Sequence, residues 1–267
     1  MIANSKTVKL RVREALRKNF FPMSVVCLIP IFTALIILMV FELLAFVIPL
    51  WAAVSFAAGL VAFLLYPLAM GMIRFFVRFI MGEAQDNITE IFFYFSSVKL
   101  YRRILNLQFL LGLRKFAILF LLSIPLIAVH MLSSPYMYSY FNISMPIWAQ
   151  SLSYIEIWLR VFVIFFYLIV SMRYYLAPFL ITVDKDMYSA EAIYMAKLIS
   201  KRTVIDFAFL IFSHLFYILA SILMVPTPFT LPYLVGAYVV HCDSAVQQYN
   251  NTIKKLNDDE AYFAQGI

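Results

Sequence analysis

Long apolar runs alternate with short polar segments along the whole chain, and this alternation predicts its architecture. A helix that crosses a bilayer needs roughly 20 mainly apolar residues, and backbone groups left unpaired in hydrocarbon cost several kcal/mol each. Runs such as residues 161–170 lack the period-two alternation of a barrel strand, so the pattern indicates helices. We therefore expect an all-α polytopic membrane protein with about six transmembrane helices, in a single transmembrane domain over residues 1–267. The predicted spans are residues 23–41, 51–73, 112–132, 155–179, 204–224 and 229–246.

Segments outside the spans have their own periodicity. Residues 1–20 predict a basic amphipathic surface helix, because Val8 and Val12 share a face opposite the cations. Capping side chains followed by an apolar stripe predict a second interfacial helix over residues 88–107. The polar residues 247–267 are expected to form a cytosolic tail.

The basic residues lie on one side of this pattern. Twenty of the 21 Lys and Arg residues precede the first span, lie between spans two and three or four and five or in the ends of spans three and four that border these segments, or follow the last span. The exception is Arg160, which follows Glu156 by four residues, the favourable order for an ion pair on one helix face. Cationic loops resist translocation, so the basic side is cytosolic. This positive-inside pattern predicts a multi-pass protein of the cell (cytoplasmic) membrane with both termini in the cytosol.

Composition supports the membrane interpretation. Mean hydropathy is +0.91 and only 13% of residues are charged, whereas charged residues make up about a quarter of a soluble domain. The net charge of +7 sits beside the predicted spans, where cations interact with anionic lipid headgroups. We therefore expect membrane lipids as partners, together with a candidate protein partner in the membrane, and no nucleic acid.

Small residues recur in the second predicted span. Ser55, Ala58, Gly59 and Ala62 are spaced so that another helix backbone can approach closely. A contact within the chain is the first expectation, and homodimerisation is the alternative.

Residues 79–119 resemble residues 179–219 without gaps. Nine of 41 positions are identical, including Tyr94 with Tyr194 and Arg102 with Arg202, against roughly three expected by chance in so biased a chain. A parallel internal repeat is therefore predicted, and transporters often place a site at the interface of such repeats.

Arg173 and Asp243 are the candidate buried ion pair. Both are predicted in the inner third of the bilayer, where a lone ion costs a few kcal/mol, and Asp206 is the rival acid for Arg173. The alternatives are a salt bridge that fixes helix register, a proton or ion relay, and side chains that reach the headgroups separately.

His214 and His241 form a candidate polar cluster inside the bundle. His241, Cys242 and Asp243 are consecutive and point about 100° apart on a helix, so they cannot converge on a metal ion by themselves. We predict no metal site and no cofactor. No catalytic motif was found, so we expect a protein that is not an enzyme.

Several short motifs resemble a known family. They are RYYLAPF at residues 173–179, Asp184, SAEAI at residues 189–193 and LPY at residues 231–233. They resemble an uncharacterised bacterial integral membrane family, domain of unknown function 975, which is similar to the membrane domain of some glycerophosphodiester phosphodiesterases. Lys201-Arg202 departs from the Lys-Gly usual in that family. The resemblance implies a six-helix bacterial membrane protein and supplies no activity.

These observations predict an integral membrane protein without an evident catalytic site. We expect a scaffold, assembly or regulatory partner in the cell envelope. The alternative is a small permease or accessory transport subunit for a lipidic or amphiphilic substrate. A water-filled cavity that reaches Arg173 and Asp243 would favour the alternative.

Overall fold

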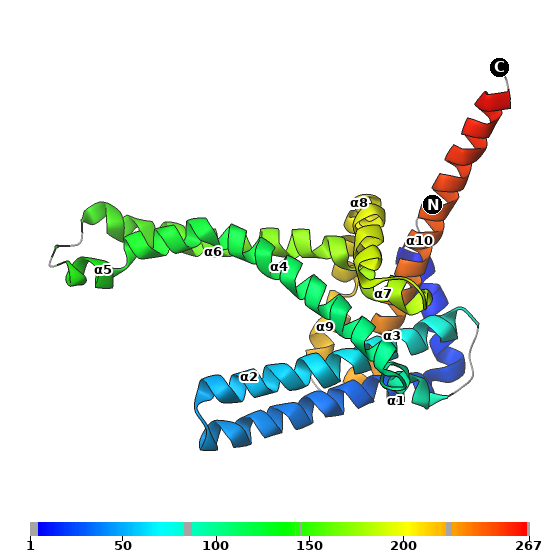
Figure 1. Cartoon of the computed structure of the whole chain (residues 1–267), viewed down its shortest axis with the longest axis horizontal. Helices are drawn as coiled ribbons and strands as arrows, with labels where there is room; N and C mark the ends of the chain where they lie inside the picture. Colours follow the sequence, from blue (N-terminus) through cyan, green and yellow to red (C-terminus); the bar gives the residue numbers. More distant parts are fainter. Residues whose placement is uncertain (1–4, 83–86, 142, 145, 223–225, 266–267) are drawn as a thin grey trace. The chain divides into compact units, whose positions relative to one another are not determined.

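The structure, a computed structural model, describes residues 5–82, 87–141, 143–144, 146–222 and 226–265. These residues form helices and short helical turns, with no strand among them, in agreement with the predicted all-α class (Figure 1). The elements in chain order are α1 (Ser5–Val47), α2 (Leu50–Leu60), the π-helical turn η1 (Val61–Leu65), α3 (Tyr66–Ile80), the 3₁₀ helix η2 (Ile88–Phe95), α4 (Val98–Ser133), α5 (Pro135–Tyr140), α6 (Ile147–Ser171), the 3₁₀ turn η3 (Met172–Tyr174), α7 (Ala177–Val183), α8 (Ser189–Ser213), α9 (Leu215–Ile222) and α10 (Thr227–Gln265).

The chain divides into two compact units. Unit 1 comprises Met1–Gln108 with Tyr175–Ile267, and unit 2 comprises Phe109–Tyr174. In unit 1, α10 packs against α1, and α3 packs against both η2 and α7. Unit 2 contains most of α4, together with α5, α6 and η3, and its two long helices lie side by side (Figure 1).

Four segments are long and apolar enough to cross a membrane. They are Asn19–Val47, Leu50–Ile80, Val98–Ser133 and Ile147–Val183. Among the described residues a fifth is added if α8 and α9, bent by 58° at their junction, count as one span. Four spans would keep both termini on one side of the membrane, whereas five would separate them.

The sixth predicted span, residues 229–246, lies in α10, which is not among these candidates. Its sequence mixes Pro, Tyr, His and Asp with the apolar residues, and this lowers its hydropathy. Ala237 and Val240 are buried in a protein core, not exposed to lipid. A count of six spans therefore stays a prediction.

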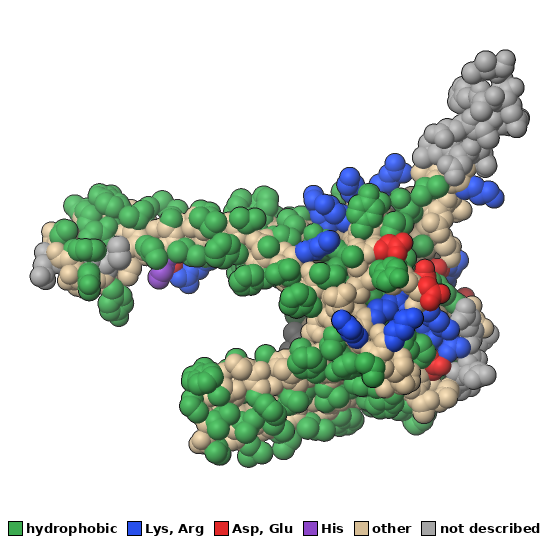
Figure 2. Space-filling model, in the orientation of Figure 1, with side chains coloured by type: hydrophobic (Ala, Val, Ile, Leu, Met, Phe, Trp, Pro, Cys, Tyr) green, Lys and Arg blue, Asp and Glu red, His purple; other side chains and the backbone are tan. Residues whose placement is uncertain are grey.

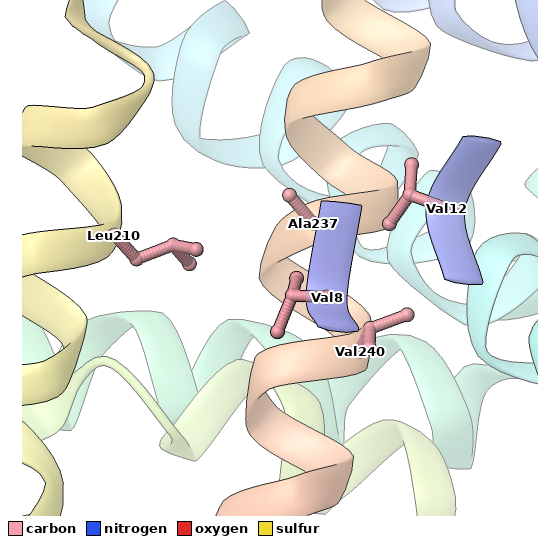
Figure 3. Packing of buried hydrophobic residues seen from close by; sticks show 5 residues of the cluster. All are labelled: Val8, Val12, Leu210, Ala237 and Val240. Carbon is pink, nitrogen blue, oxygen red and sulfur yellow. The ribbon is translucent and has the colours of Figure 1, made fainter. Parts of the chain in front are cut away.

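The predicted N-terminal surface helix is the first part of α1. Asn19 has non-helical backbone angles (φ −143°, ψ 46°), so a kink separates this part from the first apolar span. The side chains of the predicted apolar face pack against other helices: Val8 and Val12 are buried with Leu210 of α8 and Ala237 and Val240 of α10 (Figure 3). This face is therefore covered by protein. The amphipathic pattern alone could not show whether protein or lipid would cover it.

The interfacial helix expected over residues 88–107 is divided in the structure. Residues 88–95 form η2, and α4 begins at Val98. The Ser97 hydroxyl accepts a hydrogen bond from the Leu100 amide (3.3 Å), which is the geometry of a helix N-cap. From there α4 continues without a break to Ser133, through the boundary expected near Gly112. The prediction of one helix over residues 88–107 was wrong, because Ser97 caps the start of a separate helix.

The segments of the predicted repeat differ in structure. Tyr94 is buried, whereas its counterpart Tyr194 is exposed. The α4 helix is unbroken through Arg114, whereas α8 ends at Ser213, just before the equivalent position, His214. Asp86, one of the matched residues, lies outside the described residues. The repeat therefore stays a prediction.

Among the described residues, no other helix packs closely against the small-residue stripe of α2 and η1. Ser55 and Ala58 are exposed, and a Cβ added at Gly59 would meet nothing within 4 Å. The expected close contact within the chain was wrong, because α2 is covered on a different face, where Ala53 is buried.

Candidate functional site: a buried arginine cluster

The structure places Asp243 and Arg173 in different units. Asp243, in α10, accepts a hydrogen bond from Nε2 of Gln247 (2.8 Å), and Arg11 of α1 is close enough for its charge to act on the carboxylate. Arg173 is exposed in η3 of unit 2. The rival acid Asp206 belongs to α8 of unit 1, where its charge acts on Tyr175. An Arg173–Asp243 pair would join the two units and stays a prediction.

His241 belongs to a buried hydrogen-bonded group in unit 1. Its Nε2 lies 3.2 Å from the Tyr175 hydroxyl, which lies 2.9 Å from the Thr203 hydroxyl. The Tyr175 ring stacks on Phe207 with 3.9 Å between ring centroids, and the Tyr238 hydroxyl donates to the Tyr175 carbonyl oxygen (2.7 Å). Every polar group named here has a partner, so the arrangement fixes the packing of α8 against α10.

His214 has different neighbours. It lies at the junction of α8 and α9, and its Nδ1 is 2.7 Å from the Leu210 carbonyl oxygen, so Nδ1 is the donor. Its ring contacts those of Tyr217 and Tyr233. The two histidines predicted as one polar cluster therefore have separate surroundings, each within a helix junction or core.

An arginine cluster that sequence reasoning missed lies in unit 1. Arg74 directly follows the second predicted span, a position that suits a cation at the headgroups, but it is only 4% exposed. Its Nε donates to Oε2 of Glu90 (3.4 Å), its Nη1 donates to the Thr182 carbonyl oxygen (3.4 Å), and its guanidinium lies 3.6 Å from the centre of the Phe93 ring. Arg78 donates to the other oxygen of the same carboxylate (2.5 Å). One glutamate of η2 thus pairs with two arginines of α3.

Arg103 of α4 extends the cluster to the end of α7. Its Nη2 donates to the carbonyl oxygens of Ile181 (3.3 Å) and Asp184, and its Nη1 donates to that of Lys185. The Ser189 hydroxyl of α8 donates in turn to the Arg103 carbonyl oxygen (2.9 Å). The last carbonyls of a helix lack intrahelical partners and carry partial negative charge, so a guanidinium is a suitable cap. Arg74 and Arg103 together hold the end of α7 against α3 and α4.

A glycine allows Glu90 to reach the arginines. A Cβ at Gly71 would lie 1.9 Å from the Ile91 carbonyl oxygen, so only glycine permits this approach of η2 to α3. The Asn87 side chain accepts the Thr89 amide (3.1 Å) and starts η2 one turn before Glu90. Tyr94 is buried beside the charges of Arg74 and Arg103, and burial raises its pKa to about 12. The phenol therefore stays neutral at physiological pH.

Unit 2 contains a second polar cluster. The expected Glu156–Arg160 pair on α6 is confirmed, and the same Glu156 oxygen lies 3.0 Å from Nδ1 of His130 on α4. The Ser133 hydroxyl donates to the other oxygen (3.1 Å). His130 precedes Glu156 by 26 residues, so no local spacing could have indicated it.

The chemistry of both clusters is that of ion pairing. In the described part of the chain, no group of three or more His, Cys, Asp or Glu side chains could hold a metal ion. Each glutamate is bound by two basic side chains, which lowers its availability as a general base. The family resemblance inferred from short motifs stays a prediction, and no protein-family model, no curated protein and no solved structure matches this chain.

Proposed function

We propose that the protein is a multi-pass component of the cell membrane that acts as a scaffold, assembly or regulatory partner and not as an enzyme. The observation that carries this proposal is the exposure of unit 2. Only 6% of the apolar window in Val98–Ser133 and 11% of that in Ile147–Val183 is buried within the chain. Hydrophobic side chains cover the visible face of the α4–α6 hairpin (Figure 2). Such a hairpin has a large lateral surface for another membrane protein.

The interior of unit 1 supports a structural role. Arg74, Glu90, His241 and Tyr175 contact one another or the backbone in the ways described above, and these contacts join helices. A catalytic pair needs a group that can exchange a proton with a substrate. Groups engaged in ion pairs and buried hydrogen bonds suit positioning better than proton transfer.

Topology belongs to the same proposal. The charge distribution supports both termini in the cytosol, and the apolar runs support six spans. The match of residues 79–119 with 179–219 supports a parallel repeat, and the short motifs support membership of the uncharacterised bacterial family. The unequal placement of 20 of 21 cations is the main support.

The rival proposal is a permease or transport subunit for an amphiphilic substrate. It requires a path to Arg173 and Asp243. Two surface grooves among the described residues have other linings: one is formed by η2 and Ser96, and the other by residues 155–165 of α6. Neither of these two grooves supports such a path, and we therefore favour the scaffold proposal.

Site-specific photo-crosslinking in native membranes tests the scaffold proposal. A diazirine amino acid replaces Phe165 of α6 in one variant and Phe32 of α1 in the matched control, since both side chains are 59% exposed. Discrete protein adducts at position 165, in excess of those at position 32, are expected. Lipid adducts alone at both positions, in equal yield, would refute a partner surface on unit 2.

A further inference from the structure

The polar cluster of unit 2 has its acid inside and its cations outside. The Glu156 side chain is 10% exposed, whereas Arg160 is 58% and His130 is 61% exposed. Glu156 accepts from Arg160, His130 and Ser133, so both carboxylate oxygens are occupied. The carboxylate therefore orients two basic side chains whose outer faces point away from it.

Arg160 has hydrogen-bonding capacity left. A guanidinium has five N–H donors, and in the described residues only Nη2 of Arg160 is engaged, with Glu156. The surrounding surface of α4 and α6 is apolar, with exposed Ile157, Val161 and Ile164 next to the arginine. Unsatisfied polar groups are costly on an apolar surface, so these donors favour a position where a lipid headgroup or water can accept their hydrogen bonds.

The position of the cluster along α4 indicates its depth. His130 follows Lys115 by 15 residues, which at about 1.5 Å per residue places it roughly 22 Å farther along the helix. If Lys115 reaches the cytosolic headgroups, the cluster lies near the opposite boundary of a core about 30 Å thick. The connection that follows is rich in exposed aromatics, with Tyr136, Tyr140 and Trp148 among them, as is typical of the headgroup level.

We propose that Arg160, held by Glu156 beside His130, binds the phosphate of an anionic glycerophospholipid in the leaflet opposite the basic side. A phosphodiester has acceptor oxygens that match the planar fork of a guanidinium, and it carries the charge opposite to that of the exposed cation. Its glycerol and acyl chains would continue along the apolar hairpin. This inference rests on the membrane insertion that the proposed function assumes.

Energy transfer from the cluster to labelled lipid tests this site. Cys27 and Cys242 are buried, so a cysteine introduced by Ile157→Cys is the accessible position for a donor fluorophore. The full chain is placed in phosphatidylcholine vesicles that contain a small fraction of phosphatidylethanolamine with an acceptor on its amine, which makes this lipid anionic. A diacylglycerol carrying the same acceptor is the probe without phosphate.

Enrichment of the anionic probe over random mixing is expected with the wild-type cluster, by at most roughly five-fold, the value for one unpaired cation beside an anionic lipid, because Glu156 offsets part of the Arg160 charge. It falls to the random level in Arg160→Gln and largely persists in Arg160→Lys, which keeps the charge. Arg114→Gln, which removes an exposed arginine of α4 in the same unit, leaves it unchanged. Circular dichroism confirms that the variants remain helical.

Equal enrichment of both probes, or enrichment that survives Arg160→Gln, would overturn the lipid site. It would also be overturned if Arg160→Gln left the energy transfer unchanged but dissociated a complex of two copies, since the acceptor would then be a protein carboxylate. Carbonate extraction separates this inference from the proposed function. A chain removed from the membrane by carbonate contradicts both, whereas an inserted chain with random energy transfer contradicts only the lipid site.

Discussion

The two units place the arginine of an arginine–glutamate pair in opposite surroundings. In unit 1, Arg74 is 4% exposed and its partner Glu90 follows 16 residues later, on a separate helix. In unit 2, the side chain of Arg160 is 58% exposed and Glu156 lies one turn away on the same helix. The first pair depends on tertiary packing and the second on local spacing. Only the second was therefore visible in the sequence.

This difference has an energetic consequence. Removing the partner of the buried Arg74 leaves an uncompensated charge in a medium that solvates it poorly, whereas the exposed Arg160 can be solvated without its partner. Changes in the α3–η2–α7 region of unit 1 should therefore lower stability more than changes on the hairpin of unit 2. The following predictions test this contrast, beginning with the largest expected effect.

Gly71→Ala tests whether the approach of η2 to α3 holds unit 1 together. Because the added Cβ would lie 1.9 Å from the Ile91 carbonyl oxygen, the free energy of unfolding in detergent should fall by about 3 kcal/mol. Gly112→Ala is the control, since nothing lies within 4 Å of its Cβ position, and it should be neutral or slightly stabilising. Equal unfolding midpoints for the two variants, measured by circular dichroism, would refute the close packing.

Glu90→Gln tests the buried arginine cluster. Loss of the carboxylate leaves Arg74 without its ion-pair partner, and because Glu90 is itself 23% exposed we expect a loss of about 2 kcal/mol. Glu191→Gln, an exposed glutamate of α8, is the matched control. Denaturant titration of both proteins measures the difference, and a loss no larger than that of the control would show that Arg74 is solvated by other groups.

Tyr175→Phe tests the hydrogen-bonded group around His241. The ring and its stacking on Phe207 are kept, but Thr203 and His241 lose a buried partner, which should cost about 1 to 2 kcal/mol. Tyr194→Phe at an exposed position should be neutral. Thermal unfolding monitored by fluorescence compares them, and identical behaviour would mean that the hydroxyl contributes nothing.

The predicted Arg173–Asp243 ion pair would link the two units, and a double-mutant cycle tests whether the pair exists. Arg173→Ala and Asp243→Ala should each lower thermal stability in detergent, and the double variant should lose less than their sum. A coupling of at least about 0.5 kcal/mol is expected for residues in contact. Strict additivity in the double-mutant cycle would exclude the pair and leave Gln247 and Arg11 as the neighbours of Asp243.

Sequence reasoning succeeded where the deciding interaction is local. The spacing of Glu156 and Arg160 was enough to predict their pair, because residues four apart share a helix face. Helix boundaries were harder to predict. The start of α4 depends on a cap at Ser97, which lies within a run whose pattern predicts one continuous helix. Sequence reasoning also missed Gly71, the glycine that another backbone approaches closely. Gly59 was noticed because it belongs to a stripe of small residues, whereas Gly71 belongs to no such pattern.

The sequence by itself determined the helical class, the presence of several apolar segments long enough to span a membrane, and the ion pair within α6, because all three depend on properties of neighbouring residues. Only the tertiary structure decided that Val8 and Val12 pack on α10, that Arg74 is buried against Glu90, and that His214 and His241 have different partners. Lipid and a protein core are equally apolar, so hydropathy cannot tell which of them covers a side chain. Contacts between residues far apart in the chain exist only after the helices have packed.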